Sequence, residues 1–287
     1  MGDRASRGDL EGLRADLKRI GPMVVAFSGG ADSAFLAWVA TDTLGAGQVR
    51  CVTAVSPSLA PEELADCRAL ATEWGLYFDE VATEELANPA YSANDGSRCF
   101  HCKSSLMEAL APMAAGHGAV PAATVVLGVN LDDLADHRPG QQAALEAGAR
   151  FPLVDAGFSK SGIVECSRQL GLRTWDKPAA ACLASRVPYG TPVTLGRLQS
   201  VTRAESGLRA LGFRQLRVRH YGDTARIEIP PAEFATVVAL RHEVSQAVHR
   251  AGYRYVTLDL DGFRSGNLNE ALGHRGDPPL TAAEAAR

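Results

Sequence analysis

The chain has 287 residues, of which 46% are hydrophobic and 22% charged, and its formal net charge is -4. This length is enough for a large core and for two domains. The acidic balance argues against a broad nucleic-acid surface, so we expect no nucleic-acid partner. Because no apolar run approaches the roughly 20 residues that span a bilayer, and the first residues form no apolar signal core, we expect a cytoplasmic protein without membrane contact.

Strands and helices are predicted to alternate in the first part of the chain. Apolar runs predict strands at 23–27, 49–55, 77–81 and 124–129, and helical patterns lie between them near 31–44, 61–75 and 103–115. This alternation is typical of an α/β fold with a parallel sheet covered on both faces. Ligands bind at the carboxyl ends of such strands. The segments that follow three of them, Ser28–Ser33, Ser56–Ser58 and Gly128–Asp133, should therefore share one rim.

The pattern changes after Trp175. Residues 176–192 resemble a connector, and they precede a helix at 195–211, two alternating segments at 215–221 and 225–229 joined by Gly222-Asp223, a helix at 232–251 and a strand at 253–260. These elements predict a smaller α+β domain. We place the first domain at 1–176 and the second at 177–287. The tail from Gly273 has few large apolar residues and is predicted to be mobile.

The most informative motif is Ser28-Gly29-Gly30-Ala31-Asp32-Ser33, which joins the first strand to a helix. A turn through two glycines into a helix N-terminus presents free backbone N–H groups at the positive end of the helix dipole. The motif therefore predicts a phosphate cradle, and Asp32 is placed to hold a cation or the helix start. An ordinary capped turn is the alternative. S-G-G-x-D-S resembles the PP-loop of ATP pyrophosphatases, and the Walker A pattern of a γ-phosphate site is absent.

Six cysteines are too few for a disulfide scaffold in a chain of this size. Three fall in strand or helix patterns and are predicted to be buried thiols: Cys51, Cys67 and Cys166. Cys99 and Cys102 form a C-x-x-C pair in the loop before a helix, flanked by cations that would lower the thiol pKa values. With Cys182 they suit an iron–sulfur cluster with one iron left open. A zinc site and incidental thiols remain alternatives.

Cys182 lies in the connector, among small residues and beside Lys177 and Arg186. A loop thiol near such cations is predicted to be accessible and activated. The alternative is a cysteine that fills a small gap between domains.

Strand alternation from Leu216 to Arg219 places Leu216 and Val218 on one face and Arg217 and Arg219 on the other. A solvated charged face is one interpretation. The two arginines on one face of the strand carry like charges, however, and these repel each other. A bound anion such as a substrate phosphate is therefore the other interpretation.

Taken together, these motifs resemble the LarE family of ATP-dependent sulfur transferases, which act in making the nickel-pincer nucleotide cofactor of lactate racemase. The resemblance covers most of the chain. The matching segments are the PP-loop, Arg98–Lys103, Gly128–Gly140, Ala181–Arg186 and Arg217–Ile229. The combination is specific, whereas each segment alone is not.

The resemblance implies a reaction on a small nucleotide substrate. ATP adenylates a carboxylate of pyridinium-3,5-biscarboxylic acid mononucleotide, pyrophosphate leaves, and sulfur attacks the acyl-adenylate to give a thiocarboxylate. Some members sacrifice the cysteine that matches Cys182. Others also have cysteines matching Cys99 and Cys102, and these members hold a [4Fe-4S] cluster. Because this chain has all three, the resemblance favours sulfur delivery through a cluster.

The resemblance also implies residue roles. The pyrophosphate end of ATP would be held by Ser28, Gly29, Gly30, Asp32 and Ser33, with Asp32 and Asp133 on Mg²⁺. Arg217 and Arg219 would bind the substrate phosphate. The catalytic group would consist of Cys182, Asp32, Ser185, Arg186, Glu205 and Glu228. We further expect a homo-oligomer.

Three other functions compete with this interpretation. A PP-loop tRNA thiolase also pairs the loop with a three-cysteine cluster, but it needs a nucleic-acid surface that the acidic balance does not favour. An amidotransferase-type synthetase is the next alternative, although nothing in the sequence resembles a glutaminase unit. A nucleotide-binding regulatory protein with a structural metal is the non-enzymatic alternative.

Overall fold

The structure is a computed structural model that describes residues 8–116, 122–134, 139–178 and 181–264. In this part of the chain no helix combines the length and apolar character needed to cross a membrane. The tail from Gly273, which the sequence predicts to be mobile, lies outside the described residues.

The chain divides into two compact units. Of the described residues, unit 1 comprises those up to Tyr91 together with those of Ser97–Cys182, and unit 2 comprises Ser92–Gly96 together with those from Leu183 to Arg264. The change between the units follows Cys182, within the connector that the sequence indicates. Nothing in the sequence pattern indicates that the short segment Ser92–Gly96 packs with unit 2.

Unit 1 is built on a four-stranded parallel sheet with the strand order β3-β2-β1-β4. Its strands are β1 (Met23–Ala26), β2 (Val49–Val55), β3 (Tyr77–Ala82) and β4 (Thr124–Leu127). The predicted parallel sheet is therefore confirmed. β1 and β4 end slightly earlier than predicted, because the chain leaves the sheet towards Ser28 and Gly128.

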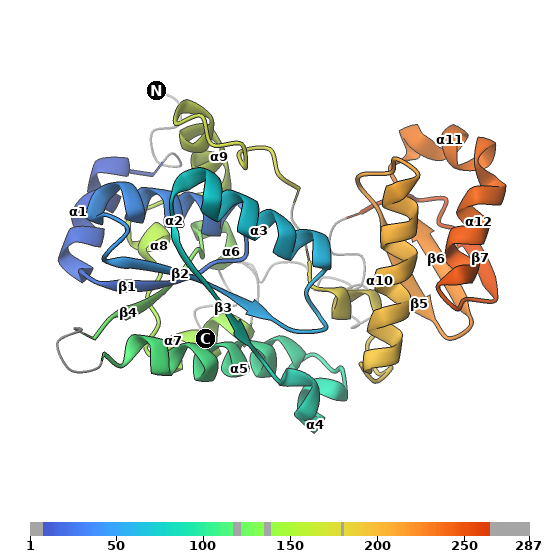
Figure 1. Cartoon of the computed structure of the whole chain (residues 1–287), viewed down its shortest axis with the longest axis horizontal. Helices are drawn as coiled ribbons and strands as arrows, with labels where there is room; N and C mark the ends of the chain where they lie inside the picture. The colour runs from blue at the N-terminus through green and yellow to red at the C-terminus, as the bar shows by residue number, and fades with distance from the viewer. Residues whose placement is uncertain (1–7, 117–121, 135–138, 179–180, 265–287) are drawn as a thin grey trace, which may run out of the picture. The chain divides into compact units, whose positions relative to one another are not determined.

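Helices cover both faces of this sheet (Figure 1). One face carries α1 (Leu10–Ile20), α2 (Ala31–Leu44), α3 (Pro61–Trp74) and α9 (Lys160–Gln169), and the other carries α5 (Arg98–Ala114) and α7 (Pro139–Glu146). Each layer has its own apolar core against the sheet. The connections include the short helical segments η1 (Glu85–Ala87), α4 (Pro89–Ser92), α6 (Leu131–Leu134) and α8 (Pro152–Asp155).

The strand order places a topological switch point between β1 and β4. From β1 the chain proceeds to β2 on one side, whereas β4 adds on the other side of β1. Open α/β sheets bind ligands outside the carboxyl ends of the strands at such a point. The segments that follow β1 and β4 are therefore the best placed to form a site in unit 1.

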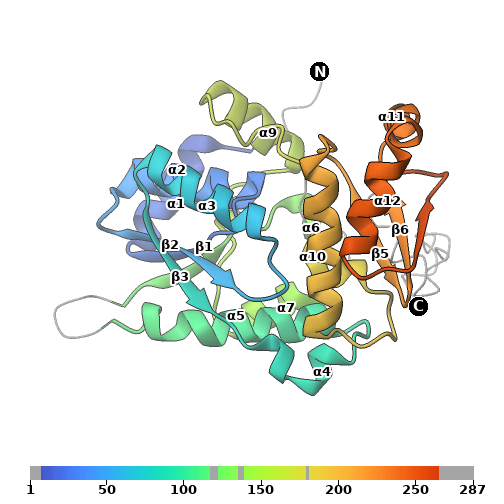
Figure 2. The ribbon, with the colours of Figure 1, turned by 45° about the vertical axis from the view of Figure 1, so that its right-hand side comes forward.

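Unit 2 contains a three-stranded sheet with the order β5-β6-β7. β5 (Arg217–Tyr221) pairs antiparallel with β6 (Thr224–Glu228), which pairs parallel with β7 (Tyr255–Leu258). Helices α10 (Leu195–Ala210) and α12 (Arg241–Arg250) cover one face (Figure 2). The remaining elements are η2 (Leu183–Arg186), η3 (Pro231–Glu233) and α11 (Phe234–Ala239). This hairpin and the α+β character agree with the sequence prediction.

The single helix predicted at 232–251 is wrong. Two helices, α11 and α12, occupy this stretch, and Leu240 separates them with φ -96 and ψ 22. Neither glycine nor proline marks the break. It is a tertiary effect, because Val237 and Val244 on either side both enter the core of unit 2.

Candidate active site

The turn between β1 and α2 carries the Ser28–Ser33 motif. The first N–H groups of an α-helix have no intrahelical acceptor, and Gly30, the N-cap of α2, has no side chain to accept a hydrogen bond from them. The Ser33 hydroxyl accepts a hydrogen bond from the Ser28 N–H at 3.2 Å and lies 3.0 Å from the Ser28 hydroxyl. The two serines thus hold the turn in shape, and the helix N-terminus faces the rim of the sheet.

Two glycines are required at this turn by close contacts. Gly29 has a φ of +68°, and a Cβ there would lie 2.8 Å from the Cys67 sulfur. A Cβ on Gly128, which follows β4, would lie 2.7 Å from the Ser33 backbone nitrogen. The first turn of α2 therefore packs directly on the backbone that leaves β4. This packing brings the two sides of the switch point together.

Lys177 fixes the turn from the side of α3. Its ammonium donates to the Gly29 carbonyl oxygen at 3.1 Å and to the carboxylates of Glu63 at 2.8 Å and Asp66 at 2.7 Å. The sequence interpretation placed this lysine beside the Cys182 thiol as an activating cation. The structure corrects that interpretation, because the two carboxylates and the carbonyl satisfy the ammonium at the PP-loop.

A pocket of about 250 Å³ opens beside the turn. Its polar lining comes from Ser28, Gly30, Asp32 and Ser33 of the turn, and from Thr53 and Lys103. Its apolar walls come from the ends of β1, β2 and β4 and from Leu106 of α5. The volume lies just below the range of about 300–1,000 Å³ that is usual for small-molecule sites. A pocket with apolar walls and a cradle of backbone donors at one end suits a nucleotide, with its base against the walls and its phosphates at the turn.

Asp32, which the sequence places to hold a cation or the helix start, forms an ion pair with Lys160. Its carboxylate accepts hydrogen bonds from the Lys160 ammonium at 2.7 and 2.8 Å. Burial raises the pKa of Asp32, Lys160 lowers it, and the nearby charge of Asp133 raises it. The Asp133 carboxylate itself accepts a hydrogen bond from the Asn130 N–H at 3.1 Å. Two carboxylates thus lie close together beside the pocket, and such oxygen ligands fit Mg²⁺.

The three cysteines predicted to act together gather around Lys103. Burial lowers the pKa of Lys103, and the charges of Cys102, Cys99 and Cys182 raise it. Cys182, although distant in the sequence, is therefore close in space to the C-x-x-C pair. Cys99 and Cys182 are exposed, and Cys102 is partly exposed. In the described part of the chain, no three His, Cys, Asp or Glu side chains converge on a single metal ion. A four-iron cluster does not require this convergence, because each of its cysteines binds a different iron.

Two expectations about the C-x-x-C pair are corrected. Both cysteines lie in the first turns of α5 rather than in the loop before a helix. Burial raises the pKa of the Cys102 thiol to about 12, and the charge of Cys182 adds to this rise. Lys103 lowers that pKa, but its effect is smaller than that of burial. Cys102 is therefore a thiol, and a metal would have to displace its proton.

The other cysteines occupy the structural positions that the sequence predicts, with one difference of degree. Cys51 in β2 and Cys67 in α3 are both fully buried. Burial raises the pKa of Cys51 to about 12 and also raises that of Cys67. Cys166 in α9 is only partly buried.

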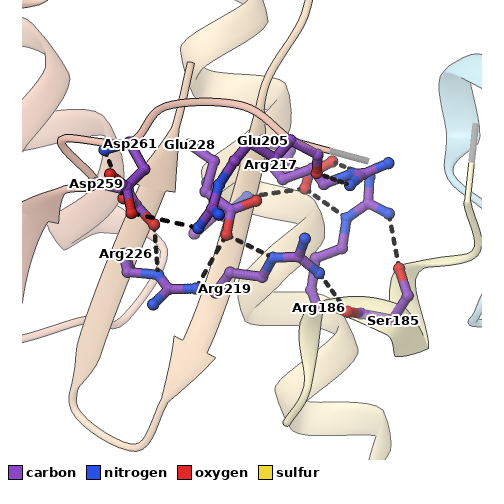
Figure 3. Close-up of polar contacts among 11 residues, drawn as sticks. Ser185, Arg186, Glu205, Arg217, Arg219, Arg226, Glu228, Asp259 and Asp261 are labelled. Atoms are coloured by element: carbon purple, nitrogen blue, oxygen red, sulfur yellow. Dashed lines mark hydrogen bonds and ion pairs between the residues drawn. The ribbon is translucent and has the colours of Figure 1, made fainter. Parts of the chain in front are cut away.

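Unit 2 holds a buried network of arginines and carboxylates (Figure 3). Glu205 of α10 is fully buried and accepts hydrogen bonds from Arg186 at 2.8 Å, Arg209 at 3.0 Å and the Val218 N–H at 3.0 Å. Glu228 of β6 is also fully buried and pairs with Arg219 at 2.9 Å and Arg226 at 3.1 Å. Each carboxylate thus fixes two guanidinium groups.

Ser185 joins the two halves of this network. Its carbonyl oxygen accepts a hydrogen bond from Arg219 at 2.6 Å, and its hydroxyl accepts one from Arg186 at 3.0 Å. Four of the predicted catalytic residues, Ser185, Arg186, Glu205 and Glu228, therefore lie within one hydrogen-bonded group. The predicted alternation of β5 is confirmed, because Leu216 and Val218 enter the apolar core, whereas Arg219 pairs with Glu228 and Arg217 contacts Phe263 and Arg264.

Arg217 differs from the other arginines of this group. It is 6% exposed, stacks over the Phe263 ring at 4.5 Å and donates to the Arg264 carbonyl oxygen at 3.0 Å. No carboxylate among the described residues forms an ion pair with it. Burial and the charges of Arg186 and Arg219 lower its pKa to about 10, against the effects of Glu228 and Glu205. Its surroundings would therefore favour a bound anion.

Comparison with known proteins decides the family. The chain is 38% identical over 260 residues to the pyridinium-3,5-bisthiocarboxylic acid mononucleotide synthase of Lactiplantibacillus plantarum, covering 91% of this chain and 93% of the relative. The chain belongs to the LarE family.

Other relatives extend over similar lengths. The chain is 48% identical over 266 residues to an uncharacterised protein of Synechocystis, covering 92% of this chain and 97% of that protein. It is 24% identical over 243 residues to an uncharacterised protein of Methanocaldococcus jannaschii, covering 85% and 91%. No protein-family model matches the chain.

Within this LarE-family chain, sequence reasoning missed one lysine that lines the pocket and another that pairs with Asp32 of its lining. Lys103 lines the pocket, but the sequence suggested it only as a cation that flanks a cysteine. Lys160 drew no attention, although the serine before it is a helix N-cap, whose hydroxyl accepts from the Gly162 N–H. Its position just after an N-cap serine, at the start of a helix, was the signal in the sequence that could have identified Lys160. Its partner Asp32 is too distant in sequence for local patterns to pair the two.

We expect Glu205→Gln to destabilise the protein by about 3–5 kcal/mol, because it leaves buried guanidinium groups without their carboxylate. The measurement is urea unfolding followed by circular dichroism. Glu243→Gln, at an exposed position of α12, is the matched control and should shift stability by less than about 0.5 kcal/mol. Equal effects of the two substitutions would show that the buried network is not holding unit 2 together.

Proposed function

We propose that this protein is an ATP-dependent sulfur transferase of nickel-pincer nucleotide synthesis. It adenylates a carboxylate of pyridinium-3,5-biscarboxylic acid mononucleotide and replaces one oxygen of that carboxylate by sulfur. The name of the Lactiplantibacillus relative, a bisthiocarboxylic acid mononucleotide synthase, supports the substrate and the product. The observation in this chain that carries the proposal is Lys103, which lines the pocket and lies within electrostatic reach of all three cysteines.

The first step is adenylation at the pocket of unit 1. A substrate carboxylate oxygen attacks the α-phosphorus of ATP, the bond to the β-phosphate bridging oxygen breaks, and pyrophosphate leaves. The N–H groups at the start of α2 would bind the pyrophosphate oxygens, whose negative charge grows as that bond breaks. The carboxylates of Asp32 and Asp133 would hold Mg²⁺, which neutralises phosphate charge when bound. Lys103 lines the same pocket and would add a positive charge.

The second step is attack of sulfur on the acyl-adenylate, with AMP as the leaving group. Cys99, Cys102 and Cys182 would hold the [4Fe-4S] cluster, which when bound supplies the sulfur atom at its open iron. The mutual charge effects among these thiols, and the exposure of Cys99 and Cys182, support this assignment. Sacrifice of the Cys182 sulfur is the competing source. It needs no partner cysteine, so the two sources predict different effects of replacing Cys99.

Unit 2 would bind the phosphate of the mononucleotide. Among the two arginines that the sequence assigned to this role, Arg217 is the better candidate, because it has no carboxylate partner in the described residues. A phosphate would take the place of the Arg264 carbonyl oxygen at its guanidinium. Arg219 is already paired with Glu228 and Ser185, so its role would be to orient the group. The cytoplasmic location and the homo-oligomeric state stay predictions.

The function is tested by incubating anaerobically reconstituted protein with ATP and the biscarboxylic acid mononucleotide, and analysing the products by mass spectrometry. We expect AMP, pyrophosphate and the thiocarboxylate. Cys99→Ser, Cys102→Ser and Cys182→Ser should each abolish the thiocarboxylate, whereas the control Cys166→Ser should retain it. Formation of ADP would contradict the proposal. Loss of product in Cys182→Ser alone would indicate that the sulfur comes from a sacrificed Cys182 and not from a cluster.

Arg217→Ala should weaken binding of the biscarboxylic acid mononucleotide by about 1.5–3 kcal/mol, the contribution of a hydrogen bond between charged groups. ATP affinity should stay within a factor of about two, because the nucleotide pocket belongs to unit 1. The measurement is calorimetric titration with each ligand. Arg254→Ala, at an exposed position just before β7, is the control. Equal substrate affinity in the two variants would show that Arg217 does not bind the substrate phosphate.

A further inference from the structure

Lys160 is placed where it faces the PP-loop from another helix. It is the first residue of α9, and its own N–H donates to the Asp132 carboxylate at 2.7 Å. Its side chain extends to Asp32, where the ammonium contacts both carboxylate oxygens at 2.7 and 2.8 Å. Asp32 lines the pocket. The ammonium of Lys160 therefore contacts Asp32, the one acidic side chain among the described residues that line the pocket.

The pair is unlike the other lysine contact of the PP-loop. Lys177 is 17% exposed, and its ammonium already donates to Glu63, Asp66 and the Gly29 carbonyl oxygen. An incoming anion would have to displace one of these acceptors. Lys160 is 42% exposed, and among the described residues its ammonium pairs with Asp32 alone. Water that reaches the exposed Lys160 ammonium screens its attraction to Asp32, and burial of the Asp32 carboxylate disfavours its charged form. Exchange of its partner is therefore energetically accessible.

Binding of a metal nucleotide would change both members of this pair. A divalent cation on Asp32 needs the carboxylate oxygens that the ammonium now contacts. The phosphates of ATP bring several negative charges to the same end of the pocket, and an ammonium is a good point-charge partner for them. The Walker lysine that serves this purpose in other nucleotide sites is absent from this loop.

We propose that Lys160 is a phosphate-binding residue that occupies the cation position on Asp32 until ATP arrives. This inference rests on the proposed ATP site. When the metal nucleotide binds, the ammonium leaves Asp32 for the pyrophosphate oxygens, and the metal takes its place. Without nucleotide, Lys160 and a divalent cation compete for the same carboxylate, so the free protein binds the metal weakly.

The test measures metal and nucleotide affinity separately, without turnover. Mn²⁺ binding is followed by loss of the free-ion electron paramagnetic resonance signal in the absence of nucleotide, and ATP binding by equilibrium dialysis without a metal. We expect Lys160→Met to bind Mn²⁺ at least tenfold more tightly than wild type, and to bind ATP at least tenfold more weakly. Lys160→Arg keeps the positive charge and should resemble wild type in Mn²⁺ affinity.

Lys18→Met, at an exposed position of α1, is the matched control and should change neither affinity. Thermal unfolding of each variant checks that the fold is retained. An Mn²⁺ affinity of Lys160→Met equal to that of Lys18→Met overturns the inference, whatever happens to ATP. Failure of the wild type to bind ATP would count against the proposed function, and the nucleotide-free metal titration would still decide whether Lys160 competes for Asp32.

Discussion

A helix that begins without a side-chain cap leaves backbone N–H groups in need of an acceptor, and α2 begins in this way at Gly30. The surrounding residues of unit 1 keep those groups available. Lys177 holds the Gly29 carbonyl oxygen, and the absence of a side chain at Gly128 lets the backbone after β4 approach Ser33. The site depends on this one arrangement, because the turn lines the pocket and carries Asp32.

In unit 2 the equivalent constraint is the cost of burying charge. Arginines that are removed from water need carboxylates or carbonyl oxygens, and Glu205 and Glu228 supply them from α10 and β6. Both carboxylates are fully buried, so they are better suited to orient guanidinium groups than to exchange protons with a substrate. Arg217 differs from the other arginines of this group, which pair with carboxylates, because its surroundings lower its pKa to about 10.

Local sequence patterns were sufficient for the parallel sheet, the hairpin of unit 2 and the PP-loop, because each depends on periodicity or on residues adjacent in the chain. The grouping of Cys182 with the C-x-x-C pair was also expected, from the resemblance to a known family, and the alternation of β5 was expected from strand periodicity. Patterns failed where distant parts of the chain decide the outcome. The pairing of Asp32 with Lys160, the commitment of Lys177 to Gly29 and the break at Leu240 are tertiary effects. The pKa of Cys102 was misjudged because neighbouring cations are visible in the sequence, whereas burial is not.

The central claim is that ATP is cleaved between its α and β phosphates to activate a substrate carboxylate. Exchange of isotopically labelled pyrophosphate into ATP tests it most directly, because this exchange requires reversible formation of the acyl-adenylate and no sulfur source. The account predicts exchange in the presence of pyridinium-3,5-biscarboxylic acid mononucleotide and Mg²⁺, and none when the mononucleotide is omitted. Absence of exchange under both conditions, in protein that binds both ligands, would contradict it.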